Sequence, residues 1–187
     1  SRRKKGWLPK PADHAIRPRH RGLRSVAAEP SGISGGKLNR TDEAHWRALE
    51  RMYLGSPINT IYGPRIEVGH KTAEIEIELG HRFFHAAGAI HGSVTWKMLD
   101  DASFFAAASL VDDVFVLTTS FTSYLTRPVS EGTLRSVGRV VNRNRSQIVA
   151  EAVAYDHAGR EVGRGNGIFV KSRMELTGIP LYAGTEE

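Results

Sequence analysis

The stretch that decides the fold is GAIHGS at residues 88–93, followed by VTWKMLDDASFFAAASL at residues 94–110. The first six residues predict a loop. The second segment predicts a helix, because it contains no proline and is rich in alanine. A helix with so few polar residues must be buried on most sides. The glycine at its start exposes backbone N–H groups that can hold a negatively charged oxygen.

Two neighbouring acids, Asp100 and Asp101, lie in the middle of this helix. Carboxylates in a buried helix are costly unless they have a partner or a chemical task. Gly92 and Asp100 are separated by about 12 Å along the helix axis, at roughly 1.5 Å per residue. A carbonyl oxygen held by the Gly92 amide is therefore out of reach of Asp100 in the same chain. If the two groups act together, the protein is a two-fold dimer whose sites are shared between subunits.

Gly88, His91, Gly92, Ser93 and Asp100 form the run Gly-x-x-His-Gly-Ser-x6-Asp. This run resembles the signature of hotdog-fold acyl-CoA thioesterases, in particular the phenylacetate-pathway type, which usually shows His-Gly-Gly and a later acid at this spacing. The resemblance covers about residues 60–172 and includes the strand patterns after the helix. It implies an α+β fold in which an antiparallel sheet of five to six strands wraps around a long central helix.

Hydrophobic periodicity predicts the same architecture independently of the resemblance. An apolar stripe of Trp46, Leu49, Met52 and Tyr53 predicts an N-terminal helix that ends at residues 55–57. Residues 73–79 alternate between apolar and acidic side chains, which is typical of a half-buried strand. Four more strands are expected, with a hairpin turn at residues 156–159; they are residues 114–124, 134–141, 148–155 and 161–170.

The charge is distributed unevenly along the 187 residues. Residues 1–40 hold eleven basic and two acidic residues, a net charge of +9, whereas residues 41–187 carry −3. We expect residues 1–40 to be a basic flexible extension, residues 41–173 a hotdog thioesterase domain and residues 174–187 a C-terminal arm. The extension has two functional interpretations, an organelle-targeting segment or a polyanion-binding arm. Because the basicity lies in the tail, the charge does not indicate a nucleic-acid-binding fold.

Composition excludes several classes of function. The chain has no cysteine, which excludes disulfides, thiolate metal sites and a cysteine nucleophile. His81 and His85 have the spacing of a metal pair on a helix but fall in an expected loop, so we predict no metal site. No apolar run is long enough to span a bilayer, and we expect a cytoplasmic protein. No cofactor is expected beyond coenzyme A as part of the substrate.

Five candidate catalytic residues follow from the resemblance. Asp100 would act as a general base on water or as a nucleophile, and the Gly92 amide would stabilise the oxyanion. His91 would orient the loop through hydrogen bonds. His85 stands where relatives commonly carry Asn or Gln to bind the thioester carbonyl, and Thr118 where a related class carries a hydroxyl near the attacking water. Each residue also has a purely structural interpretation, which for His91 and Thr118 carries equal weight.

Four further residues are candidates for substrate binding. Ser93 replaces the second glycine of the family motif, and its hydroxyl would either cap the helix or narrow the pocket. Arg127, Arg139 and Arg143 belong to a basic series on or near strands. They either meet the phosphates of coenzyme A at the pocket mouth or are solvated strand arginines. Asp101 is the alternative acid if Asp100 is structural.

The function that this sequence predicts is hydrolysis of an acyl-coenzyme A thioester to a free acid and coenzyme A, by a homodimer or a dimer of dimers. The alternative is a non-catalytic hotdog module that binds acyl-CoA without turnover. A hotdog dehydratase would need a catalytic histidine and an acid in another arrangement. Binding of nucleic acid or a membrane surface by the tail would give a salt-sensitive affinity that is lost on deleting residues 1–40.

Overall fold

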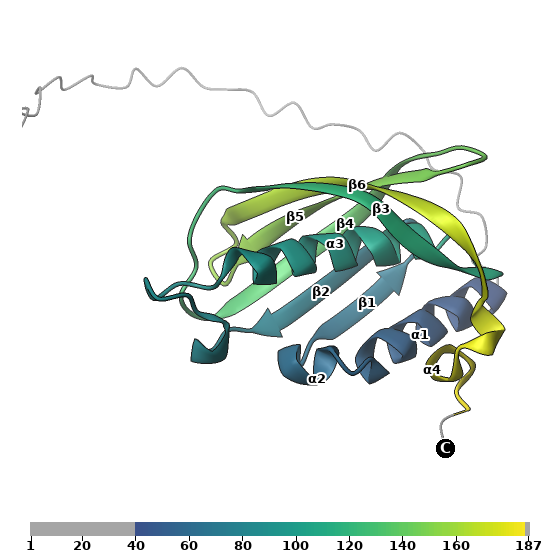
Figure 1. Cartoon of the computed structure of the whole chain (residues 1–187), viewed down its shortest axis with the longest axis horizontal. Coiled ribbons are helices and arrows are strands. Elements are labelled where there is room, and N and C mark those ends of the chain that lie inside the picture. The colour runs from purple at the N-terminus through teal and green to yellow at the C-terminus, as the bar shows by residue number, and fades with distance from the viewer. Residues whose placement is uncertain (1–39, 186–187) are drawn as a thin grey trace, which may run out of the picture. The chain divides into compact units, whose positions relative to one another are not determined.

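The computed structural model describes residues 40–185, so the predicted basic extension lies outside the described residues except for Arg40. The described part contains six strands, four helices and two 3-10 turns (Figure 1). The helices are α1 (Arg40–Gly55), α2 (Asn59–Tyr62), α3 (Gly92–Ala108) and α4 (Pro180–Ala183). The strands are β1 (Arg65–Gly69), β2 (Thr72–Glu78), β3 (Val114–Leu125), β4 (Thr133–Arg143), β5 (Ile148–Asp156) and β6 (Glu161–Glu175). The turns are η1 (His81–Phe83) and η2 (Leu176–Gly178).

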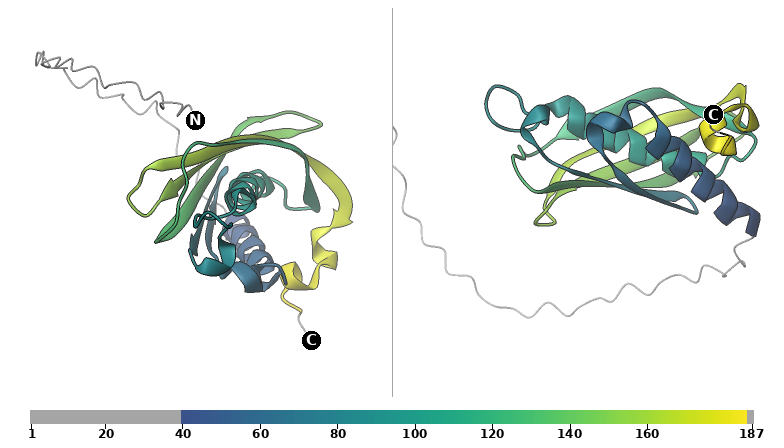
Figure 2. Two further views of the ribbon diagram at one scale, coloured as in Figure 1. Left: turned by 60° about the vertical axis from the view of Figure 1, so that its left-hand side comes forward. Right: turned by 90° about the horizontal axis from the view of Figure 1, so that it is seen from below.

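All six strands form one antiparallel sheet in the order β1-β2-β4-β5-β6-β3. The sheet curves around α3, which Figure 2 shows end-on inside it. Met98, Leu99, Ala102 and Ala106 of this helix are fully buried, as its apolar sequence predicts. The predicted α+β architecture, with an N-terminal helix before the sheet, is confirmed.

The contact between α3 and the sheet is closest at Gly138 of β4. A Cβ atom at this position would lie 2.1 Å from the carbonyl oxygen of Ala102 in α3. The helix backbone therefore rests directly on the strand, and only glycine fits. In β6, Gly165 and Gly167 leave room for the ring of Phe121, since a Cβ atom at either position would lie within 2.7 Å of that ring. These glycines make this face of the sheet thin where the Phe121 ring packs on it.

The structure differs from the predicted elements in two places. Strand β1 was not expected, because it is only five residues long and a single one of its side chains, Val68, is fully buried. Strand β1 is instead defined by its antiparallel pairing with β2. Strand β6 continues past residue 170 to Glu175, into the segment expected as a C-terminal arm. Its last residues are mostly exposed and polar, so they show no apolar alternation.

The predicted hairpin turn between β5 and β6 is confirmed. Gly159 has a φ of +74°, a conformation that favours glycine. The Asp156 carboxylate accepts hydrogen bonds from the backbone N–H groups of Ala158 and Arg160, at 3.0 and 2.9 Å. A short acidic side chain that binds nearby N–H groups is typical of such turns.

The segment after β6 packs against α1, where α4 and α1 lie side by side (Figure 1). The hydroxyl of Tyr182 donates to Nδ1 of the buried His45 at 2.7 Å, while Nε2 of His45 donates to the carbonyl of Ala108 at 3.0 Å. One histidine thus connects α1, the end of α3 and the C-terminal segment. Within residues 40–185, no helix has the length and apolar character needed to cross a membrane.

Candidate active site

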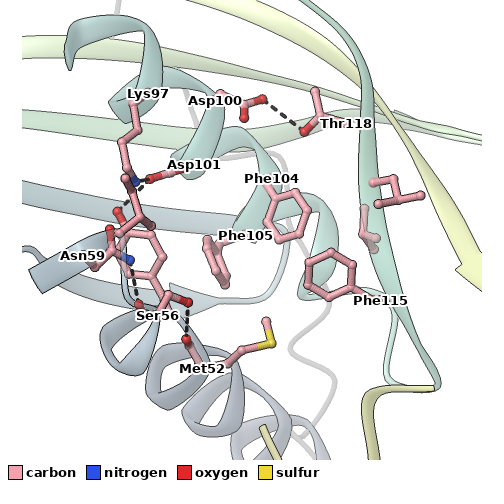
Figure 3. A pocket seen from close by; sticks show the side chains of 14 residues that line it. Met52, Ser56, Asn59, Lys97, Asp100, Asp101, Phe104, Phe105, Phe115 and Thr118 are labelled. Atoms are coloured by element: carbon pink, nitrogen blue, oxygen red, sulfur yellow. Dashed lines mark hydrogen bonds and ion pairs between the residues drawn. The ribbon is translucent and has the colours of Figure 1, made fainter. Parts of the chain in front are cut away.

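A cavity of about 310 Å³ opens between α1 and α2 on one side and β3 on the other, with α3 as its floor. Figure 3 shows its lining. Three aromatic rings supply much of the apolar wall, those of Phe104, Phe105 and Phe115. The polar part of the wall includes Asp100 and Asp101 from α3. An apolar cavity with a few converging polar groups is the usual form of a small-molecule site.

Asp100 and Thr118 meet at the wall of this cavity. Although they are distant in sequence, the Thr118 hydroxyl donates a hydrogen bond to Asp100 Oδ1 at 3.2 Å (Figure 3). Burial raises the pKa of Asp100 to about 6, and the neighbouring charge of Asp101 adds to the rise. The Thr118 hydrogen bond and the charge of Lys97 act in the opposite direction. A carboxylate with this pKa is ionised at neutral pH and is a stronger base than an ordinary aspartate.

Asp101 faces another direction, toward α1. Its Oδ2 accepts a hydrogen bond from the Tyr53 hydroxyl at 2.8 Å and forms an ion pair with Lys97, one turn earlier on α3. No sequence motif marks Lys97 or Tyr53 as a site residue. The spacing of Lys97 and Asp101, four residues apart on one helix, is the signal that could have found the ion pair. Tyr53 was assigned only by its apolar periodicity.

The start of α3 is capped by His91. Its Nδ1 accepts a hydrogen bond from the backbone N–H of Ser93 at 3.1 Å and lies 2.7 Å from the Ser93 hydroxyl. Its own backbone N–H donates to the carbonyl of Phe83 at 2.7 Å, which connects the loop to the turn before it. Within residues 40–185, no hydrogen bond uses the N–H of Gly92. A Cβ atom at Gly92 would lie 2.7 Å from Cδ1 of Leu125, so β3 passes close to the helix start.

His85 lies in the exposed loop before α3. Its Nδ1 accepts a hydrogen bond from the backbone N–H of Ala87 at 3.0 Å. In the neutral ring the proton is therefore on Nε2, which makes this nitrogen a donor. The expected role of His85 toward a carbonyl oxygen needs such a donor.

The three candidate arginines lie in separate places. Arg127 is exposed in the bend after β3. Arg139 is on the face of β4 opposite to Gly138 and pairs with Glu151 at 2.5 Å, away from the cavity. Arg143, at the end of β4, lines a different surface depression with Arg145. The structure does not gather them at one pocket mouth in a single chain, because Arg127 lies in the bend after β3 whereas Arg139 and Arg143 lie at two different points along β4.

Metal-ligating side chains do not cluster in the described part of the chain. Among its residues, no three His, Asp or Glu side chains are placed to hold a metal ion. His81 instead packs its ring against Phe84, with ring centroids 5.0 Å apart.

Comparison with known proteins gives both a family and a fold. Residues 87–162 match the model of the Thioesterase superfamily. No curated protein matches the sequence. Among solved structures, the E. coli PaaI protein from the phenylacetic acid degradation operon aligns with a TM-score of 0.65 at 15% identity, over 72% of this chain and 98% of that one.

Two further solved structures show the same fold. A thioesterase family protein from Silicibacter pomeroyi aligns with a TM-score of 0.60 at 22% identity, covering 66% of this chain and 96% of that one. A putative esterase from Mycobacterium tuberculosis aligns with a TM-score of 0.59 at 22% identity, covering 63% of this chain and 97% of that one. The fold is therefore the hotdog fold, and residues 87–162 are similar in sequence to the thioesterase superfamily. This sequence match supports thioester hydrolysis as the general activity.

Proposed function

We propose that this protein hydrolyses acyl-coenzyme A thioesters and that it does so as a homodimer with two shared sites. The observation that carries the proposal is the pairing of Asp100 with Thr118 at the wall of an apolar cavity, on the same helix that begins with the free N–H of Gly92. The superfamily match supports thioester hydrolysis, and coenzyme A as the thiol part of the substrate is our extension of it.

Strand β3 supports the assignment of a dimer. It is twelve residues long and lies at the end of the sheet, so one of its edges has no partner strand among residues 40–185. Leu117, Tyr124 and Leu125 on this strand are about half exposed. A long apolar edge strand is a liability unless another strand covers it. Antiparallel pairing with the same strand of a second copy would cover it.

The same pairing would bring the two halves of the site together. Within one chain, Leu125 lies beside Gly92 and Thr118 beside Asp100, so both groups are placed along β3. When two copies of β3 pair antiparallel, the Leu125 end of one strand lies near the Thr118 region of the other. The Gly92 amide of one subunit then approaches Asp100 of its partner, with the two-fold axis near Thr122.

In the proposed reaction, the thioester carbonyl oxygen accepts a hydrogen bond from the Gly92 N–H at the positive end of α3. Asp100 of the other subunit removes a proton from water, whose oxygen attacks the carbonyl carbon. Thr118, bonded to the carboxylate, helps to hold the water in line. The tetrahedral intermediate collapses with cleavage of the C–S bond, and the sulfur leaves as coenzyme A after taking up the proton. The cavity beside Asp100 holds the acyl group.

A thiol-release assay with a panel of acyl-CoA esters tests this function. We expect turnover by the wild type and a loss of about 10²–10⁴-fold in Asp100→Asn, because the general base is removed while the shape is kept. Binding of an acyl-CoA without any release of thiol would instead identify a non-catalytic binding module. Full activity in Asp100→Asn would contradict the mechanism.

His85 can be tested separately. If its Nε2–H binds the carbonyl oxygen, His85→Ala should lower kcat, and His85→Gln should retain more activity because an amide N–H can replace the imidazole donor. His81→Ala, in the preceding turn, is the matched control. An unchanged kcat in His85→Ala would show that the residue only shapes its loop.

A further inference from the structure

The acid next to the proposed base is held in place by two other side chains. Asp101 Oδ2 accepts the Tyr53 hydroxyl at 2.8 Å and contacts the Lys97 ammonium. The side chains of Lys97 and Asp101 are only 15% and 18% exposed. A partly buried ion pair is costly to build, and replacing it with apolar residues is often neutral or stabilising. The position of this pair, at the wall of the cavity beside Asp100, points to a role other than stability.

The Lys97 ammonium is also held in place by neighbouring side chains. The Lys97 ammonium lies 5.2 Å from the ring centre of Tyr53 and 5.0 Å from that of Tyr62, both within cation–π range. Burial and the charge of Asp101 raise the pKa of Tyr53, so its hydroxyl stays protonated and acts as a donor. One carboxylate oxygen of Asp101 is thus held between two donors, the Tyr53 hydroxyl and the Lys97 ammonium.

Asp100 therefore has a second carboxylate beside it on its own helix. That charge raises the pKa of Asp100, while the charge of Lys97 lowers it, in addition to the larger effect of burial. Tyr53 of α1 is the other titratable side chain in the cavity lining, and β3 contributes the Thr118 hydroxyl to it. Tyr62 of α2 lies outside this lining, against the Lys97 ammonium. In the proposed dimer, the partner's helix start would add its own His85 and His91.

We propose that Lys97, Asp101 and Tyr53 form one positioning unit, which holds a negative charge beside Asp100 and so sets the pH range in which Asp100 accepts a proton. This inference rests on the proposed function, since it assigns a pH dependence to the same reaction. Neither Lys97 nor Asp101 needs to touch the substrate. Their effect is electrostatic and acts through Asp100.

Two substitutions should shift the acidic limb of the kcat/KM–pH profile in opposite directions. Asp101→Asn removes the negative charge and leaves Lys97 uncompensated, so the acidic limb of kcat/KM should move to lower pH by about one unit. The same variant should have a lower plateau, because a weaker base removes the proton less readily. Lys97→Met removes the positive charge, and the limb should move to higher pH. A purely structural role would not produce shifts of opposite sign.

Matched controls come from the exposed ion pair between Asp113 and Lys171, in which the ammonium lies 2.9 Å from the carboxylate. Asp113→Asn and Lys171→Met make the same chemical changes outside the cavity lining, and the acidic limb should stay in place in both. The double variant Lys97→Met/Asp101→Asn leaves no unpaired buried charge, so it guards against loss of folding in the single variants. Its limb should lie between those of the two single variants.

Titration of the Asp100 carboxyl by ¹³C NMR, assigned with Asp100→Asn, reads the same effect without any substrate. Opposite shifts of its midpoint in Asp101→Asn and Lys97→Met would support the inference even if no acyl-CoA were hydrolysed, in which case the proposed function alone would fail. Hydrolysis by the wild type combined with an unmoved midpoint, or with shifts of the same sign, would overturn the inference and leave the proposed function intact.

Discussion

Asp100 combines two properties that usually conflict in a side chain. It is buried enough for its pKa to rise to about 6, and it still lines a cavity that a substrate can enter. Thr118 donates a hydrogen bond to it, and Asp101 and Lys97 supply fixed charges close by. A carboxylate in such surroundings is poised to accept a proton near neutral pH.

The pH dependence of the reaction follows from this pKa. Only the ionised carboxylate can take a proton from water, so kcat/KM should fall about tenfold per pH unit below a pH of about 6. Above that value the rate should reach a plateau. Measuring kcat/KM from about pH 5 to about pH 8 checks this prediction. An acidic limb centred near pH 4, the value for an ordinary aspartate, would contradict it.

The same pKa predicts a gain in stability when the base is removed. The pKa of Asp100 is higher in the folded protein than the ordinary value of 3.8, so its ionisation costs folding free energy above about pH 6. That cost is absent below the ordinary pKa. Asp100→Asn should therefore be more stable than the wild type at pH 7 by about 1–2 kcal/mol, a value reduced for partial exposure. At low pH the two proteins should be equally stable.

Urea unfolding of both proteins at neutral and acidic pH measures this difference. Asp113→Asn is the control, because Lys171 holds the pKa of the exposed Asp113 below its usual range and its ionisation carries no such cost. An Asp100→Asn protein that is less stable than the wild type at pH 7 would show that the carboxylate has a structural role.

At the scale of elements, the position of α3 depends on the small residues beneath it. The carbonyl oxygen of Ala102 occupies the space that a side chain at Gly138 would need. Gly138→Ala should therefore push helix and strand apart and destabilise the protein by about 1–3 kcal/mol or more. The free energy of unfolding in urea gives the measurement. Gly80→Ala is the control, because the space around Gly80 is open and its backbone is extended, and an equal loss in both variants would refute the explanation.

Sequence periodicity was sufficient for the elements that bury a regular stripe or face. It predicted α1 and the strands from β2 to β6, whereas α3 was predicted from its alanine-rich, proline-free and almost wholly apolar sequence. It missed β1, which has too few buried side chains to show a period, and the polar end of β6. Pairing with a neighbouring strand stabilises both segments, and such pairing is not visible in a single stretch of sequence.

In the candidate site too, some residues could be predicted from the sequence and others could not. Asp100 and the helix start were found by their spacing within one segment. The contact between Asp100 and Thr118 joins α3 to β3, and the one between Asp101 and Tyr53 joins α3 to α1. The sequence allowed Thr118 as a site residue by resemblance but assigned Tyr53 to the core. The three arginines were grouped by charge alone, and the structure places them apart.

At the scale of the whole molecule, the proposed dimer makes each site depend on both subunits. The two-fold axis inferred from β3 passes near Thr122, whose side chain is exposed. Thr122→Lys would place two like charges opposite each other across the axis, which opposes strand pairing. We expect this variant to be monomeric in light scattering and to lose hydrolysis, although Asp100 and Gly92 are unchanged. Val141→Lys, an exposed position on β4, should remain dimeric and active. An active monomer in Thr122→Lys would exclude a shared site.

The amino-acid sequence by itself determined the hotdog architecture, the buried helix and the presence of two acids in it. Those features depend on periodicity and local spacing, which a linear pattern records. Only the tertiary structure decided that the neighbouring acids face different partners, with Thr118 beside Asp100 and Tyr53 with Lys97 around Asp101. The physical reason is that adjacent residues of a helix point about 100° apart, so their surroundings come from different elements that meet only when the sheet closes around the helix.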